Sequence, residues 1–215
     1  MTIAMPRDGE IYDAVILADG SYPSAGMAAG ILSAAARVVC CDGSVREFSA
    51  RGGMPYAVVG DCDSLGSELR ERFAGILHCD SDQYSNDLTK AVAFCRARGM
   101  RRLAILGATG KREDHTLGNI SLLADYSEYA DVSMVTDHGV FNPIRCGSTF
   151  GSFPGQQVSI FTFTPQTLIT TGNLLYPLCD APLAGWWQGT LNESMGDDFS
   201  IGTTGPAVVF RAFRQ

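Results

Sequence analysis

The sequence predicts an α/β fold in two domains, a doubly wound, mostly parallel sheet domain followed by a small all-β domain. Up to Val135, short runs of valine, isoleucine and leucine alternate with longer amphipathic segments. Continuous apolar runs are typical of strands buried on both faces of a parallel sheet. After Asp137 the segments are alternating and β-branched, which favours strands. Hydrophobic residues are 46% and charged residues 18% of the 215 residues, so packed cores are expected.

The first domain is assigned to residues 1–137. Its predicted strands are the apolar runs at 13–18, 37–41, 56–60, 75–79, 102–107 and 131–136. A helix-like segment follows the third run, and the apolar residues of 85–99 and 113–126 recur at helical spacing. Strand and helix patterns that alternate in this way predict a doubly wound α/β domain.

The second domain is assigned to residues 143–215. The stretch 142–155 is rich in Gly, Pro and Ser and is interpreted as a loop or linker. The predicted strands that follow are at 157–164, 167–172, 197–204 and 207–213. Trp186 and Trp187 are adjacent in an expected strand, where one ring would enter the core and the other an interface, unless they stack on an aromatic substrate.

Charge and hydropathy exclude several classes of protein. A net charge of −7 disfavours a protein that coats nucleic acid, which needs a basic face. We expect no signal peptide, since the N-terminus lacks a basic segment followed by a long apolar run. We expect no membrane partner, since no apolar stretch reaches the roughly 20 residues that span a bilayer. The seven cysteines include no CxxC spacing and are interpreted as reduced, buried residues. These features favour a cytoplasmic protein.

Acidic residues gather in the loops that follow the predicted strands, where ligands bind in open parallel sheets. These loops contain CDGS at 41–44, GDCDS at 60–64, CDSDQYSNDLTK at 79–90 and GATGKREDH at 107–115. Taken singly, Asp63, Asp87 or Asp114 could simply cap or begin a helix. Capping does not require Asp61 as well, and clustered carboxylates repel unless a hard divalent cation lies among them. Asp61 and Asp63 are therefore predicted to hold Mg²⁺.

The loop at 107–115 differs from a P-loop. Only two residues separate Gly107 from Gly110, and Arg112 stands where Ser or Thr is needed. Its glycines still allow backbone amides to approach a phosphate, with Lys111 or Arg112 to counter the charge. Together with the metal carboxylates, this loop predicts nucleotide-dependent phosphoryl or pyrophosphoryl transfer.

The ordered motifs CDGS, GDCDS, DQYSNDLTK and GATGKREDHTLGNISLL resemble those of the thiamine pyrophosphokinase family. The motifs extend from Val38 to Leu123, and the two-domain layout extends the resemblance to the whole chain. The resemblance implies a nucleotide-binding α/β domain followed by a β-sandwich that binds thiamine. It also implies Mg²⁺-dependent transfer of pyrophosphate from ATP to the thiamine hydroxyl, giving thiamine diphosphate and AMP, in a homodimer with the thiamine site between subunits.

Carried over position by position, the resemblance implies a role for each matching residue. The catalytic set would be Asp61, Asp63, Asp87, Arg112 and Asp114, of which Asp61, Asp63 and Asp87 would hold the metal. The ATP site would contain Asp42, Gly43, Ser64, Lys90, Gly107, Gly110, Lys111 and Arg112. Thiamine would contact Gln83, Asp114, Trp187, Thr190 and Asn192.

The sequence departs from the family pattern at Ser44, Tyr84 and Asn86, and Leu191 stands where the family has serine. Leu191 makes a pyrophosphokinase for another alcohol, such as a pterin, an alternative. A second alternative is a non-catalytic module that senses nucleotide or thiamine. A third is a glycosyltransferase with a DxD metal site, in which the R-x-DH loop and the β domain would have no role.

Overall fold

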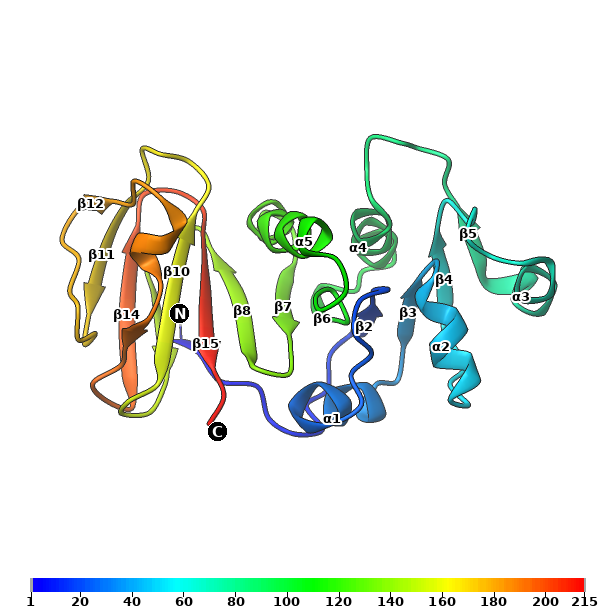
Figure 1. The fold of residues 1–215 in the computed structure, drawn as a ribbon, viewed down its shortest axis with the longest axis horizontal. Coiled ribbons are helices and arrows are strands. Elements are labelled where there is room, and N and C mark those ends of the chain that lie inside the picture. Colours follow the sequence, from blue (N-terminus) through cyan, green and yellow to red (C-terminus); the bar gives the residue numbers. More distant parts are fainter. Residues whose placement is uncertain (1, 215) are drawn as a thin grey trace. The chain divides into compact units, whose positions relative to one another are not determined.

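Buried aliphatic runs form the strands of the first sheet in the computed structural model, which describes residues 2–214 (Figure 1). The strands are β2 (Ala14–Leu17), β3 (Val38–Cys41), β4 (Ala57–Gly60), β5 (Leu77–Cys79), β6 (Arg102–Leu106) and β7 (Asp131–Val135). Every residue of β2, β3 and β4 is buried, as expected for strands covered on both faces. All six predicted strands of the first domain are confirmed.

The strands lie in the order β7-β6-β2-β3-β4-β5, and each neighbouring pair is parallel. The helices between them are α1 (Gly26–Ala34), α2 (Ser44–Ala50), α3 (Ser67–Arg72), α4 (Asp87–Ala97) and α5 (Glu113–Tyr126), with a 3-10 turn η1 (Ala74–Ile76). The chain runs outward from β2 to β5 and then returns to β6, so the strand order reverses between β2 and β6. Right-handed crossovers therefore place α1 and α2 on one side of the sheet and α4 on the other (Figure 1). The doubly wound fold is confirmed.

The β-rich part contains β1 (Thr2–Ile3), β8 (Gly139–Ile144), β9 (Ser148–Gly151), β10 (Gln157–Thr162), β11 (Leu168–Gly172), β12 (Ala181–Pro182), β13 (Asn192–Glu193), β14 (Asp198–Thr203) and β15 (Ala207–Ala212). One layer has the order β13-β10-β15-β8, and the other has the order β1-β9-β14-β11-β12. Both layers contribute to one core, in which Phe150 stacks on Phe199 with ring centroids 5.1 Å apart. This arrangement confirms the predicted β-rich second domain.

Two sequence-based expectations for this part were wrong. The stretch 142–155 is not a loop, because β8 extends into it and β9 lies within it, and Phe150 is fully buried. Its glycine, proline and serine content concealed these strands. The two tryptophans do not lie in a strand, since Trp186–Gly189 forms the 3-10 helix η2.

The chain divides into two compact units that are not continuous in sequence. The α/β unit contains Arg7–Asn119 and Tyr129–Asp137, and the β unit contains the N-terminal residues through Pro6, Ile120–Glu128 and the chain from His138 onward. A buried arginine fixes the N-terminal strand in the β unit. The Arg211 guanidinium donates to the carbonyls of Ile3, Ala4 and Gly151 and to the Asn142 side chain, at 2.7–3.1 Å. Among residues 2–214, no helix is both long and apolar enough to cross a membrane.

Candidate functional site

A cavity of about 500 Å³ opens in the α/β unit where the loops after β2, β3, β4 and β6 converge. This is the edge at which the strand order reverses, the position where open α/β sheets bind ligands. Many of the residues predicted from the sequence line it: Asp42, Gly43, Asp61, Asp63, Ser64, Asp87, Lys111 and Arg112. The topology thus brings together loops that are far apart in the sequence.

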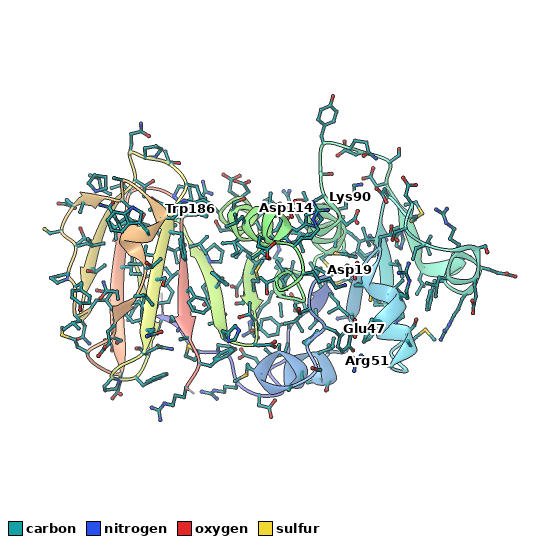
Figure 2. All side chains as sticks on the ribbon, viewed as in Figure 1. Asp19, Glu47, Arg51, Lys90, Asp114 and Trp186 are labelled. Carbon is teal, nitrogen blue, oxygen red and sulfur yellow. A yellow bond between two sulfur atoms is a disulfide. The ribbon has the colours of Figure 1, made fainter. Side chains whose placement is uncertain are left out.

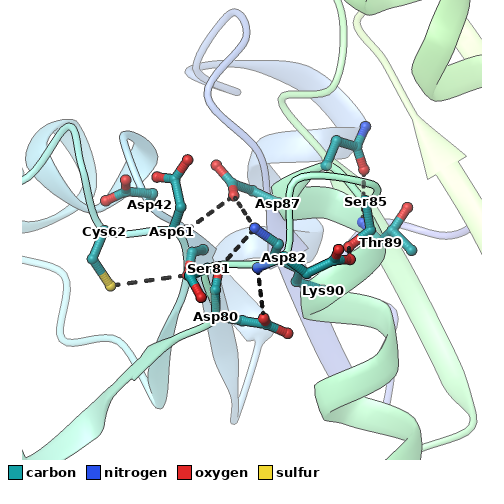
Figure 3. Close-up of polar contacts among 12 residues, drawn as sticks. Asp42, Asp61, Cys62, Asp80, Ser81, Asp82, Ser85, Asp87, Thr89 and Lys90 are labelled. Carbon is teal, nitrogen blue, oxygen red and sulfur yellow. Dashed lines mark hydrogen bonds and ion pairs between the residues drawn. The ribbon is translucent and has the colours of Figure 1, made fainter.

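Three carboxylates meet on one wall of the cavity. Asp42 follows β3, Asp61 follows β4 and Asp87 stands in the first turn of α4. One oxygen of each lies within 4.8 Å of the others (Figure 3). The sequence placed Asp42 with the ATP-binding residues, whereas the structure groups it with Asp61 and Asp87. We call these residues the acidic triad.

Gly60, the last residue of β4, permits this close approach. A Cβ atom at this position would lie 2.7 Å from the Asp42 Cβ and 3.0 Å from the Asp87 Oδ1. Any larger side chain would therefore push these two acids apart.

Backbone amides orient the triad. Asp87 Oδ1 accepts from the Asp61 amide at 3.3 Å, Asp42 Oδ2 accepts from the Ser64 amide at 3.3 Å, and Asp61 Oδ1 accepts from the Asp63 amide at 3.0 Å. The other oxygen of Asp42 is buried and has no hydrogen-bond partner. A buried acceptor of this kind is unusual and calls for a ligand. An oxygen-preferring cation such as Mg²⁺ fits this donor set.

The electrostatics of the triad also favour a cation. Burial raises the pKa of the Asp42 carboxyl despite the hydrogen bonds from Ser64. Burial, and then the nearby charges of Asp61 and Asp42, raise the pKa of Asp87. Lys90 only partly offsets this, because its Nζ is 3.9 Å from Asp87 Oδ1 and donates instead to the carbonyl of Asp80 at 2.8 Å. Lys90 is buried beneath the triad and does not line the cavity.

Basic side chains lie on the β6 side of the cavity. Lys111 pairs at 2.9 Å with Asp19. Asp19 is labelled in Figure 2. The Arg112 guanidinium makes a forked contact with the Asp114 carboxylate, at 3.0 and 2.5 Å. This contact lowers the pKa of Asp114 to about 2. Asp114 therefore orients Arg112, which lines the cavity, while Asp114 itself does not.

The loop after β2 was missed by the sequence analysis. Asp19 and Gly20 line the cavity. A Cβ atom on Gly20 would lie 2.3 Å from the carbonyl oxygens of both Gly107 and Thr109, so the loops after β2 and β6 touch backbone to backbone. The sequence ADGS at 18–21 follows a strand as CDGS does, and the same positional reasoning would have found it.

The first residues of α3 and α4 show whether Asp63 and Asp87 act as helix caps. Gly66 is the N-cap of α3 and makes no side-chain cap, so Asp63 does not cap this helix. Asn86 caps α4 by accepting from the Thr89 amide at 2.9 Å, which leaves Asp87 in the first turn with its carboxylate beside those of Asp42 and Asp61. Asn86 also donates to Asn119, another residue of the cavity wall.

Other predicted residues lie outside this cavity. Gly107 and Gly110 have positive φ values of 64° and 90° and shape the β6 loop. Gln83 is exposed in the loop before α4.

The predicted thiamine contacts at 187–192 belong to the β unit. Trp187 is 75% exposed, whereas the Trp186 indole donates to the Thr162 carbonyl. Thr190 and Asn192 line a smaller cavity of about 180 Å³. The Asn192 amide is buried and bonds to both backbone groups of Tyr176, at 3.1 and 2.7 Å. Asn192 therefore shapes this cavity by holding its wall.

One cysteine pair departs from the expectation of reduced, buried thiols. Cys62 and Cys79 form a disulfide. Among the others, Cys40, Cys41 and Cys95 are buried thiols, as expected, but Cys146 and Cys179 are exposed. The sequence separation and the absence of a CxxC motif gave no indication of this bridge.

Comparison with known proteins identifies the family. The family model described as "Thiamin pyrophosphokinase, catalytic domain" matches residues 28–135, and "Thiamin pyrophosphokinase, substrate-binding domain" matches residues 139–210. The chain belongs to the thiamine pyrophosphokinase family. This is a family of enzymes, and the resemblance inferred from the four motifs is confirmed.

Individual relatives support the assignment to this family. Thiamine pyrophosphokinase 1 of Oryza sativa subsp. japonica is 33% identical over 97 residues, which cover 40% of this chain and 37% of that protein. The structure of thiamin pyrophosphokinase from Candida albicans has a TM-score of 0.80 at 14% identity, covering 99% of this chain and 92% of that one. The Bacillus subtilis thiamine pyrophosphokinase structure has a TM-score of 0.75 at 17% identity, covering 94% and 100%. These structures share the fold of nearly the whole chain.

Proposed function

We propose that this protein is a thiamine pyrophosphokinase, which transfers pyrophosphate from ATP to the hydroxyl of thiamine and forms thiamine diphosphate and AMP. The observation that carries the proposal is the acidic triad, with its unpartnered buried oxygen, facing Lys111 and Arg112 across one cavity. Carboxylates on one wall and basic side chains on the other are suited to binding a polyphosphate together with its metal ion.

The acidic triad would hold Mg²⁺, and Asp63, which lines the same cavity, offers a further oxygen. When bound, the ion neutralises polyphosphate charge and orients the phosphates for attack. Arg112 would bind phosphate oxygens through its planar fork while Asp114 holds it in place. Lys111 adds a second positive charge at the cavity edge. These residues supply binding, orientation and electrostatic stabilisation.

The low pKa of Asp114, about 2, argues against its acting as a general base, since an effective base titrates near the working pH. Asp114 is therefore proposed as a positioning residue for Arg112.

The remaining members of the ATP site are Asp42, Gly43 and Ser64 at the cavity wall and Gly107 and Gly110 in the β6 loop. Lys90 would support Asp87 from below.

The β unit is proposed to bind thiamine in a homodimer. Its surface exposes Trp187, Tyr176, Leu191 and Met195, each more than half exposed. Exposed apolar side chains in such a group are typical of an interaction surface. The family resemblance favours a second copy of the chain as the partner, with Gln83 and Trp187 contributing to thiamine sites between subunits.

The test is an incubation with ATP, Mg²⁺ and thiamine, followed by chromatography of the nucleotides and thiamine esters. The proposal predicts AMP and thiamine diphosphate in equal amounts. ADP with thiamine monophosphate would indicate simple phosphoryl transfer. Binding of ATP without any product would favour the sensing module, and turnover only with a pterin alcohol would favour the other pyrophosphokinase. The variant Asp61→Asn serves as the inactive control.

A further inference from the structure

The loop that carries Asp61 and Asp63 is covalently attached to the neighbouring strand. Cys62 stands between the two acids, and its disulfide joins it to Cys79, the last residue of β5, with 5.6 Å between the Cα atoms. Figure 3 shows Cys62 directly beside Asp61, with Asp80 nearby. The bridge therefore lies next to the acidic triad without belonging to it.

The backbone at Cys62 needs such a restraint. Its φ is +65°, a left-handed conformation that non-glycine residues rarely adopt unless their surroundings hold them. Two hydrogen bonds hold this residue in addition to the bridge. The Cys62 carbonyl accepts from the Arg70 guanidinium and from the Leu65 amide. The backbone amide of Asp61 donates one long hydrogen bond, of 3.3 Å, to the Asp87 carboxylate.

The same bridge also fixes the neighbouring loop beneath the triad. Cys79 is followed by Asp80, whose amide donates to the Gly60 carbonyl at 2.8 Å. The carbonyl of Asp80 accepts from Lys90, which lies under Asp87. Loosening either end of the bridge would consequently disturb the surroundings of both Asp61 and Asp87.

We propose that the Cys62–Cys79 disulfide is a positioning element for the metal-binding carboxylates, and that its reduction switches the site to weaker cation binding. The inference rests on the proposed function only in that the acidic triad holds a divalent cation. It adds a redox control that acts through loop geometry.

The bridge is chemically accessible from one side. Cys79 is exposed, whereas only 1% of Cys62 is exposed. A thiolate of dithiothreitol would attack the Cys79 Sγ, form a mixed disulfide and release the Cys62 thiolate, which takes up a proton. The second thiol of the reagent then closes its own disulfide and releases Cys79. Two electrons and two protons pass from reagent to protein, and glutathione disulfide reverses the change while forming two glutathione molecules.

The test compares Mn²⁺ binding, measured by electron paramagnetic resonance without nucleotide, in oxidised protein and in protein reduced with dithiothreitol and then freed of reagent. Reduction should weaken Mn²⁺ affinity about tenfold, the effect of having to order roughly one further backbone residue on binding. The variant Cys79→Ser should bind Mn²⁺ weakly in both conditions. Cys146→Ser, which removes an exposed free thiol of the β unit, should behave like the parent. Reoxidation with glutathione disulfide should restore the affinity of the parent and of Cys146→Ser, but not that of Cys79→Ser.

Equal Mn²⁺ affinity in the oxidised and reduced protein would overturn the proposal, even if reduction lowers the melting temperature, because the bridge would then only stabilise the fold. Two free thiols at positions 62 and 79 after treatment with glutathione disulfide, detected by alkylation and mass spectrometry, would overturn it as well. Redox-dependent Mn²⁺ binding without AMP formation would refute the proposed enzyme activity but leave the positioning role intact.

Discussion

At the scale of single residues, the proposed function depends on the carboxylates that follow β3 and β4. Asp61→Asn and Asp63→Asn should each lower turnover on the order of a thousandfold, because losing a ligand to a hard cation removes several kcal/mol of transition-state stabilisation. Steady-state assays at subsaturating Mg²⁺ measure this loss. Asp197→Asn, an exposed acid of the β unit, is the matched control. Near-normal activity in either variant would remove that residue from the metal site.

Arg112 tests a different property, the geometry of its guanidinium. Arg112→Lys keeps the charge but cannot form the forked contact seen with Asp114. Turnover should fall about tenfold to a hundredfold, the value of one charge-assisted hydrogen bond. Arg7→Lys, at an exposed position, is the control. Full activity in Arg112→Lys would mean that Arg112 acts only as a surface charge.

The end of strand β4 shows how an element positions the site. Gly60→Ala would place a methyl group 2.7 Å from the Asp42 Cβ, so the acidic triad has to spread. We expect Mg²⁺ affinity and turnover to fall at least about tenfold, with a loss of unfolding free energy of about 1–3 kcal/mol from overpacking. Gly66→Ala is the matched control in the same loop, because no atom lies within 4 Å of the added carbon. Unchanged Mg²⁺ affinity in Gly60→Ala would contradict the role given to this glycine.

Elements of the α/β unit could be predicted from the sequence, because a strand buried on both faces has an uninterrupted apolar pattern. The strands β8 and β9 could not, since partners across the sheet stabilise a segment whose own composition is that of a loop. Val208 pairs with Pro143, for example, and Phe199 with Phe150. Tertiary contacts of this kind override local composition.

The sequence predicted which loops form the site, but not which side-chain atoms contact each other within it. Position after a strand predicted that Asp42 and Asp61 would meet, because the edge of a parallel sheet gathers those loops. It did not predict that the Asp42 carboxylate would lie with those of Asp61 and Asp87, an arrangement that depends on Gly60 and on the Ser64 amide. The bond between Cys62 and Cys79 was equally hidden, since cysteine spacing does not determine which thiols meet in space.

Assembly is the question at the scale of the whole molecule. If thiamine lies between subunits, a chain with Asp61→Asn and a chain with Trp187→Ala should each be inactive as homodimers. Mixed after reversible dissociation, they should regain about a quarter of the parental activity, because half of the dimers are mixed and each has one intact site. Trp187 suits this test because it is 75% exposed and its removal should leave the fold intact. A monomer in sedimentation at micromolar concentration, or mixtures no more active than their parents, would contradict the shared site.

The stability of the metal-free protein should depend on pH, in a direction that the pKa values of the acidic triad determine. Burial and neighbouring acids raise the pKa of Asp42 and Asp87 above the ordinary value of 3.8. The folded protein therefore retains protons that the unfolded chain has already lost, and metal-free stability falls as the pH rises through the raised pKa values. A bound cation replaces those protons, so binding in this pH range should release them.

Calorimetric titration of Mg²⁺ into the nucleotide-free protein tests most directly whether Asp42, Asp61 and Asp87 form one cation site. We predict one site per chain in the parent, with a heat that depends on the buffer below the raised pKa values because protons are released. Asp42→Asn should abolish this site and raise the melting temperature of the metal-free protein by relieving repulsion. Mg²⁺ binding of equal strength in the parent and in Asp42→Asn would contradict the account.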